Sequence, residues 1–127
     1  MERRNTFGKK EHLCGKTTID DLYKMGESIF LYPFRTTYRE VPQEEVPIKC
    51  LVSAPKRKFK HAVDRNRLKR LMREAYRKNK HELFSVMEEK EATLLLAFSY
   101  IGDKVEPQAF VEKRMIQTLG KILKAKK

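Results

Sequence analysis

The fold is decided by the stretch AVDRNRLKRLMREAYRKNK, which occupies residues 62–80. Its apolar side chains recur at the three- and four-residue spacing that places them on one face of an α-helix. We therefore predict a helix over residues 62–80, with Asp64 as its N-cap. The buried side of this helix is predicted to consist of Leu68, Leu71, Met72, Ala75 and Tyr76.

The opposite side of the same helix carries a row of polar and cationic side chains, which we call the basic stripe: Asn66, Arg70, Arg73 and Arg77. It spans about 16 Å at a rise of ~1.5 Å per residue, and Lys69 flanks it. The guanidinium fork of arginine binds phosphate oxygens through two hydrogen bonds at once. A merely solvated charged face is the alternative, but like charges four residues apart destabilise a helix. The stripe therefore predicts nucleic-acid binding.

The charge of the whole chain is concentrated around this helix. The 127 residues include 29 Lys and Arg against 17 Asp and Glu, which gives a net charge of +12. In residues 56–80 only Asp64 and Glu74 oppose the cations. Self-repulsion of this size disfavours a compact state unless an anion offsets it, so we expect a polyanionic partner. The cations of the segment are Lys56, Arg57, Lys58, Lys60, Arg65, Arg67, Lys69, Arg70, Arg73, Arg77, Lys78 and Lys80.

Several classes of protein are excluded by composition. No apolar run approaches the ~20 residues of a membrane-spanning helix, and the N-terminus lacks the apolar centre of a signal peptide. Cys14 and Cys50 lie far apart in the sequence, which favours two free thiols in a reducing compartment over a zinc site. We expect one cytoplasmic domain over residues 1–127, with a flexible segment at 1–15 and no membrane partner.

The remaining elements follow from periodicity and from turn residues. A short helix is predicted over residues 19–25, with Thr18 as N-cap and Gly26 as its end. Strands are predicted at 28–40, interrupted near Pro33, at 48–54 and at 93–100, with a hairpin turn at 41–47. A short helix at 81–89 and a last helix that begins near Pro107 complete an α+β sandwich, in which strands 48–54 and 93–100 are parallel if they are neighbours.

The loop before the basic helix, residues 54–61, extends the cationic surface. Its side chains Lys56, Arg57, Lys58, Lys60 and His61 are expected to face phosphate. His61 could act as a general acid or base, but no second histidine, paired carboxylate or metal-ligand cluster lies near it in the sequence. Residue chemistry therefore predicts neither a catalytic site nor a metal site in this chain.

Residues 60–77, KHAVDRNRLKRLMREAYR, resemble the signature of the bacterial ribonuclease P protein subunit. That signature has an A-V-x-R-N-R run, a hydrophobic residue and K-R, followed by R-E-A and an aromatic residue. The resemblance implies a fold like domain 2 of ribosomal protein S5, with a four-stranded sheet and the order αβββαβα. It also implies a large catalytic RNA as partner, which cleaves precursor tRNA with bound magnesium, and no obligate protein partner.

The resemblance further implies which residues meet RNA. The RNA-binding surface would comprise Lys56, Arg57, Lys58, Lys60, His61, Arg65, Asn66, Arg67, Lys69, Arg70, Arg73 and Arg77. The cleft for the single-stranded 5′ leader of precursor tRNA would be lined by Ile19, Tyr23, Ser53 and either Thr37 or Tyr38. The last choice depends on a one-residue register, which reverses the face of a strand.

The chain departs from the family pattern at Lys60-His61, where relatives carry Gly-Asn, and at Ile19, where relatives carry an aromatic residue. Two other functions are compatible with a basic helix. One is a structural RNA-binding protein of the ribosomal type, and the other is a standalone nuclease that uses His61. A copurifying RNA that cuts precursor tRNA in magnesium would separate the three readings.

Overall fold

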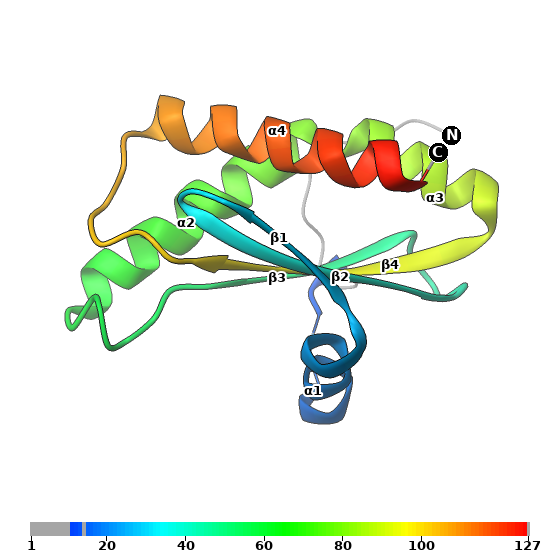
Figure 1. The fold of residues 1–127 in the computed structure, drawn as a ribbon, viewed down its shortest axis with the longest axis horizontal. Coiled ribbons are helices and arrows are strands. Elements are labelled where there is room, and N and C mark those ends of the chain that lie inside the picture. Colours follow the sequence, from blue (N-terminus) through cyan, green and yellow to red (C-terminus); the bar gives the residue numbers. More distant parts are fainter. Residues whose placement is uncertain (1–10, 14, 127) are drawn as a thin grey trace.

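The computed structural model describes residues 11–13 and 15–126 (Figure 1). It confirms the predicted α+β class, with two successive helices between the third and fourth strands. In chain order the elements are α1 (Lys16–Met25), β1 (Glu27–Leu31), β2 (Phe34–Pro42), β3 (Ile48–Ser53), α2 (Ala62–Asn79), α3 (His81–Lys90), β4 (Ala92–Tyr100) and α4 (Gln108–Lys126).

The four strands form one sheet in the order β1-β2-β4-β3. β3 and β4 are parallel neighbours, as predicted, whereas β1–β2 and β2–β4 are antiparallel. The predicted hairpin at residues 41–47 is wrong, because β4 lies between β2 and β3 and the connection crosses over it. The hairpin lies instead at Tyr32-Pro33, where a cis peptide bond joins β1 to β2.

One face of the sheet is covered by α2, α3 and α4 (Figure 1). Alternate residues of β4, namely Leu94, Leu96, Phe98 and Tyr100, point into this layer and are buried. The predicted apolar side of α2 packs there together with the apolar side of α4, and Leu71 and Leu123 lie at the margin of the core. This face holds most of the buried apolar surface, and burial of such surface is the main favourable term in folding.

On the other face α1 is the only helix among residues 11–13 and 15–126 (Figure 1). Its buried cluster is small and consists of Leu13, Leu22, Leu95 and Ala97. α1 is held close to the sheet by Gly26, where a Cβ atom would lie 2.5 Å from the carbonyl oxygen of Leu22 and 2.9 Å from that of Tyr38. Gly26 therefore ends the helix, as predicted, for a steric reason.

Both predicted N-caps are wrong. α1 is preceded by Gly15, and α2 by His61, neither with a capping side-chain hydrogen bond. Each helix begins earlier than the polar residue chosen as its cap, so that Thr18 and Asp64 lie inside the first turn. An acidic side chain there still interacts favourably with the positive end of α2.

Part of the segment predicted to be flexible packs against the sheet. Residues 1–10 and 14 lie outside the described residues. His12 forms a parallel bridge with Cys50, and the buried Leu13 donates its backbone N–H to the Cys50 carbonyl at 3.0 Å. Residues 11–13 thus extend the sheet at the edge of β3.

Candidate nucleic-acid interface

The basic stripe lies on the outer surface of α2. Asn66, Arg70 and Arg73 are exposed, while the apolar side of the helix faces the core. Arg77 is already engaged, since its Nη2 lies 2.8 Å from Glu74 Oε2. This contact lowers the pKa of Glu74. Asn66, Arg70 and Arg73 are therefore the members of the stripe best placed to bind an anion.

Arg65 holds the basic loop (residues 54–61) against the start of α2. Its Nη1 donates to the carbonyl oxygens of Phe59 at 2.7 Å and Lys60 at 3.0 Å. Phe59 is buried and packs its ring against Tyr100, with centroids 5.8 Å apart. The end of the loop next to α2 is thus anchored, so that Arg65, predicted as an RNA contact, also positions its neighbours. Arg67 is exposed and Lys69 half-buried on the same helix.

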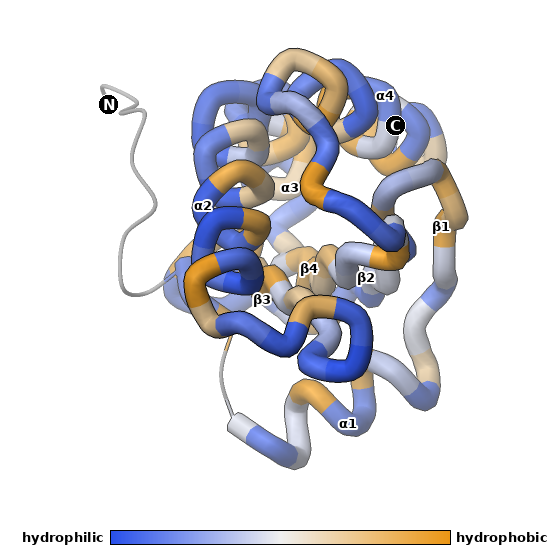
Figure 2. The backbone as a smooth tube through the Cα atoms, turned by 90° about the vertical axis from the view of Figure 1, so that its left-hand side faces the viewer, coloured by the Kyte–Doolittle hydropathy of each residue, from blue (hydrophilic) through white to orange (hydrophobic). Residues whose placement is uncertain are grey.

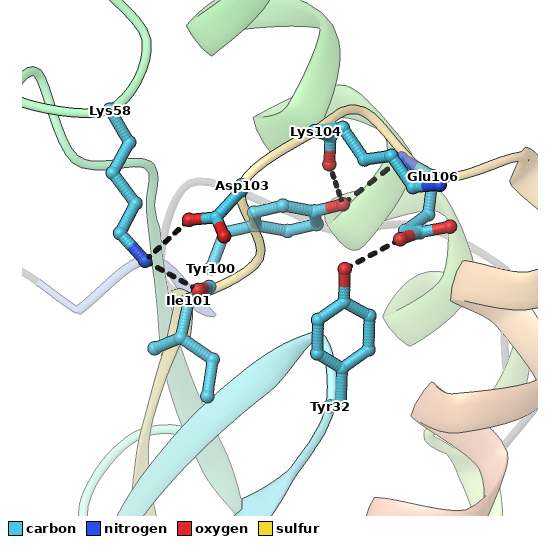
Figure 3. Close-up of polar contacts among 7 residues, drawn as sticks. All are labelled: Tyr32, Lys58, Tyr100, Ile101, Asp103, Lys104 and Glu106. Atoms are coloured by element: carbon cyan, nitrogen blue, oxygen red, sulfur yellow. Dashed lines mark hydrogen bonds and ion pairs between the residues drawn. The ribbon is translucent and has the colours of Figure 1, made fainter.

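Lys58 ties the basic loop to the loop between β4 and α4 (Figure 3). Its Nζ donates to the Ile101 carbonyl at 2.7 Å and lies 3.2 Å from Asp103 Oδ1. Tyr100 organises that second loop, because its hydroxyl donates to the Lys104 carbonyl at 2.6 Å and accepts from the Glu106 N–H at 3.0 Å. Lys58 is thereby partly neutralised, although it is exposed like Lys56, Arg57, Lys60 and His61.

The loop adjoins a hollow of about 310 Å³ at the end of the sheet, whose lining includes Arg35, Ser53, Arg57, Lys58 and Ser99. Strand pairing explains why these residues meet: Arg35 on β2 is the partner of Ser99 on β4, and Ser99 is the partner of Ser53 on β3. The hollow therefore combines cationic side chains with hydroxyls on the α1 face of the sheet.

The same line of partners continues to β1, where Phe30 pairs with Arg35. The Arg35 guanidinium carbon lies 5.3 Å from the centre of the Phe30 ring, which is 66% exposed. We call Phe30, Arg35, Ser99 and Ser53 the cross-strand row. It crosses all four strands and spans about 14 Å at ~4.8 Å per strand.

The sequence predictions missed Phe30, Arg35 and Ser99. Because side chains alternate along a strand, Arg35 could have been placed on the same face of β2 as Thr37 from the sequence alone. Placing Ser99 and Phe30 beside Arg35 requires knowledge of the strand order.

Tyr23 overhangs this row from α1. Its side chain is 41% exposed, and its hydroxyl lies 3.5 Å from Ser99 Oγ, which is in turn 3.3 Å from Ser53 Oγ. The structure thus brings together Tyr23 and Ser53, two of the predicted cleft residues. Ile19, a third, is half-buried and packs against the small cluster under α1.

The alternatives Thr37 and Tyr38 lie on opposite faces. Tyr38 points into the helix layer, is 7% exposed and has the Lys126 ammonium 5.6 Å from its ring centre. Its assignment to the cleft is therefore corrected, because the register of β2 turns it into the core. Thr37 shares the α1 face, but it is buried beneath Gly26 and lies 3.3 Å from Ser28 Oγ.

Residues 11–13 and 15–126 contain no group of three or more His, Cys, Asp or Glu side chains that could hold a metal ion. In the same residues no helix is both long and apolar enough to cross a bilayer. His61 is exposed and directly precedes α2. Cys50 is buried, and burial raises the pKa of its thiol.

Comparison with known sequences identifies one family. The model of the Ribonuclease P family matches residues 7–101. The chain is 38% identical over 120 residues to the ribonuclease P protein component of Porphyromonas gingivalis strain W83, covering 92% of this chain and 88% of that protein. It is 34% identical over 107 residues to the ribonuclease P protein component of Chlorobium phaeobacteroides, covering 80% of this chain and 73% of that protein.

Solved structures share the fold at low sequence identity. The RNase P protein of Thermotoga maritima aligns with a TM-score of 0.68 at 18% identity, covering 87% of this chain and 96% of that one. The RNase P protein of Staphylococcus aureus aligns with a TM-score of 0.66 at 18% identity, covering 92% and 98% of the two chains.

Proposed function

The chain belongs to the ribonuclease P protein family, and on that premise we propose that it binds the catalytic RNA subunit of ribonuclease P and the 5′ leader of precursor tRNA. In this proposal the protein assists the magnesium-dependent endonucleolytic cut that gives the mature tRNA 5′ end. The RNA subunit carries the chemistry, and the protein contributes affinity and position.

The observation that carries this proposal is the juxtaposition of two surfaces at one end of the sheet. The basic stripe and the basic loop offer guanidinium forks suited to a phosphate backbone. The hollow beside the loop offers Arg35, Ser53 and Ser99 beneath the exposed ring of Tyr23. A structured RNA on the first surface would deliver a single strand to the second.

The cross-strand row has the chemistry of a single-strand site. Unstacked bases gain about 1–3 kcal/mol each by stacking on an aromatic ring, and Arg side chains add contacts to the backbone. Tyr23 and Phe30 supply exposed rings at two points of the row, with Arg35 between them. These features favour a leader of several nucleotides over a structural RNA-binding role of the ribosomal type.

Magnesium is proposed as the ion of the reaction, held mainly by the RNA subunit and the substrate. Magnesium prefers carboxylate and water oxygens in octahedral geometry. The side chains assigned to the proposed RNA surface carry guanidinium, ammonium, imidazole, amide and hydroxyl groups, which do not fit that preference. We therefore assign this chain's residues to binding and orienting RNA.

Reconstitution tests the proposal. The purified protein is mixed with the RNA subunit transcribed from the same genome and with a precursor tRNA in magnesium. We expect cleavage at the mature 5′ end by the complex, and none by protein that has been freed of RNA with micrococcal nuclease. Cleavage by the RNA-free protein would refute the proposal in favour of a standalone nuclease.

Two arginines of one strand test the leader site. Arg35 and Arg39 both lie on β2 and on the α1 face, about 13 Å apart at ~3.3 Å per residue. We expect Arg35→Gln to weaken binding of substrates with a leader of several nucleotides more than of substrates with a single one. Arg39→Gln removes the same charge outside the hollow and is the matched control. Equal effects of the two variants on leader preference would contradict this site.

A further inference from the structure

α4 carries a second row of polar and cationic side chains that the α2 surface does not account for. Arg114, Gln117, Lys121 and Lys124 recur every three or four residues, so that they lie on one side of the helix. Together with Leu31 and Gly120 they line a hollow of about 370 Å³ between α4 and β1. We call these residues the α4 groove.

The groove lies away from the basic stripe. In Figure 2 α2 forms one flank of the molecule and β1 the other, with α4 above β1. One straight RNA segment lying along α2 would therefore not reach the groove.

The cations of the groove are not neutralised by the fold. Within residues 11–13 and 15–126, neither Lys121 nor Lys124 has an acidic partner. Lys126, two residues after Lys124, contrasts with them, because its Nζ lies 3.3 Å from Glu40 Oε1. α4 has five basic residues against Glu112 alone. An exposed excess of this kind attracts a polyanion.

The Arg114 side chain is held in place at the groove by neighbouring side chains of α4. Its Nη1 donates to Gln117 Oε1 at 3.0 Å, which turns the amide NH₂ of Gln117 away as a further donor. Its guanidinium carbon lies 5.2 Å from the centre of the Phe110 ring. Its Nε is enclosed and has no hydrogen-bond partner in the described residues. A buried donor without a partner is unfavourable, so the contacts within the protein leave this guanidinium incompletely satisfied.

Gly120 keeps the floor of the groove open. A Cβ atom at this position would meet nothing within 4 Å, and the residue has an ordinary helical backbone. Neither packing nor conformation therefore requires glycine there, although glycine inside a helix is less stable than alanine. The absence of a side chain lets a ligand approach the helix backbone between Arg114 and Lys124.

We propose that the α4 groove is a second RNA-backbone site, which binds a segment of the RNA subunit different from the one on the basic stripe. The inference rests on the proposed function for the identity of that RNA. Three cationic side chains and an amide over about 15 Å of helix match a run of phosphates, as they do on α2. The lysines make it a site of charge attraction more than of fixed geometry.

Salt-dependent binding of the full chain to the transcribed RNA subunit tests the proposal. Each lost phosphate contact of a lysine lowers the salt slope of the binding constant by about one. We expect Lys121→Gln/Lys124→Gln to lower that slope by about two and the affinity by about tenfold. The matched control is Lys16→Gln/Lys104→Gln, which removes two exposed charges elsewhere and should leave the slope unchanged. A slope equal to that of the control would overturn the proposal.

Two substitutions of Gly120 separate charge from bulk. Gly120→Glu and Gly120→Gln place side chains of the same size in the groove, and we expect the Glu variant to lose far more affinity. Equal affinity of the two variants would also overturn the proposal.

A third variant, Arg70→Gln/Arg73→Gln, distinguishes failure of the second site from failure of the proposed function. If this pair loses affinity while the α4 pair matches its control, only the second site fails. If the wild type itself does not bind the RNA subunit, both fail. In hydroxyl-radical footprinting of the RNA subunit, the α2 double variant and the α4 double variant should each lose protection at a different RNA segment. Loss of protection at the same segment in both variants would contradict two separate sites.

Discussion

The two faces of the sheet differ in how completely helices cover them. α2, α3 and α4 bury the face that carries Leu96 and Phe98, and its core extends from β2 to the last turns of α4. On the α1 face the apolar residues that β4 buries against the single short helix are Leu95 and Ala97. At the end of the same strand, Ser99 remains at the edge of a hollow.

Because of this difference, we expect one face to contribute mainly to the stability of the fold and the other mainly to ligand binding. Burial of apolar area contributes roughly 25 cal/mol per Å², so the helix face supplies most of the folding free energy. The sparsely covered face leaves hydroxyls, a guanidinium and aromatic rings available to a ligand. Substitutions on the two faces should therefore change different measured quantities.

The largest expected effect contrasts adjacent residues of β4. Phe98 is fully buried on the helix face, with its ring centroid 5.9 Å from that of Tyr76, and Phe98→Ala should lower the free energy of unfolding by about 3–5 kcal/mol. Ser99→Ala, on the other face, should lower it by less than about 1 kcal/mol. Urea denaturation of both variants measures this difference, and equal losses would contradict the division between the faces.

The next effect concerns the outer surface of the helix layer. Arg70→Ala and Arg73→Ala should each weaken binding of the RNA subunit by about 1–3 kcal/mol, because charge-assisted contacts to phosphate are lost. Both side chains are exposed opposite the core, so the free energy of unfolding should change by less than about 0.5 kcal/mol. Lys78→Ala, which is exposed on α2 outside the basic stripe, is the matched control. A loss of affinity as large for Lys78→Ala would indicate a diffuse charge effect.

Local patterns made the helices and strands predictable. α2, α3, β3 and β4 lie within two residues of their predicted ends, since each has an unbroken apolar period. The caps failed because a polar residue near a helix start can occupy the cap or the first turn, and the sequence pattern does not distinguish them. The C-terminal end of α1 was predicted from Gly26, and the tertiary contacts around this residue supply the steric reason.

The strand order was not predictable from local patterns. Pro42 at the end of β2 and Pro47 before β3 indicated a hairpin, yet β4, about 40 residues further along, pairs with both strands. The cross-strand row follows only from that order. The basic stripe, in contrast, depends on one helix alone, and for that reason the sequence predicted its exposed members correctly.

A smaller effect is expected at Tyr23, which overhangs the α1 face. Tyr23→Leu should reduce the preference of the holoenzyme for leaders of several nucleotides, by at most the ~1–3 kcal/mol of one base stack. Because the side chain is 41% exposed, the melting temperature should stay nearly unchanged. Tyr23→Phe keeps the ring and should keep the preference. An unchanged preference in Tyr23→Leu, together with a lower melting temperature, would make Tyr23 a packing residue.

The smallest effect is expected at Tyr32, which lies in the hairpin turn that joins β1 to β2 (Figure 3). Its hydroxyl donates to Glu106 Oε2 at 2.6 Å, and this contact raises the pKa of Tyr32 to about 12 from 10.0. Only the protonated hydroxyl can donate, so the bond stabilises the folded state fully below about pH 10. That contribution is lost as the pH rises toward about 12, because the unfolded chain then ionises more readily.

Tyr32→Phe removes this hydrogen bond and nothing from the core. Since the side chain is 43% exposed, water screens the interaction, and the free energy of unfolding at pH 7 should fall by less than about 1 kcal/mol. The difference from the wild type should shrink between about pH 10 and pH 12, as measured by urea denaturation. Ultraviolet titration of tyrosine ionisation should show one fewer tyrosine with a raised pKa in the variant than in the wild type. A difference that grows with pH would contradict the assigned contact, because the sign of the linkage would then be reversed.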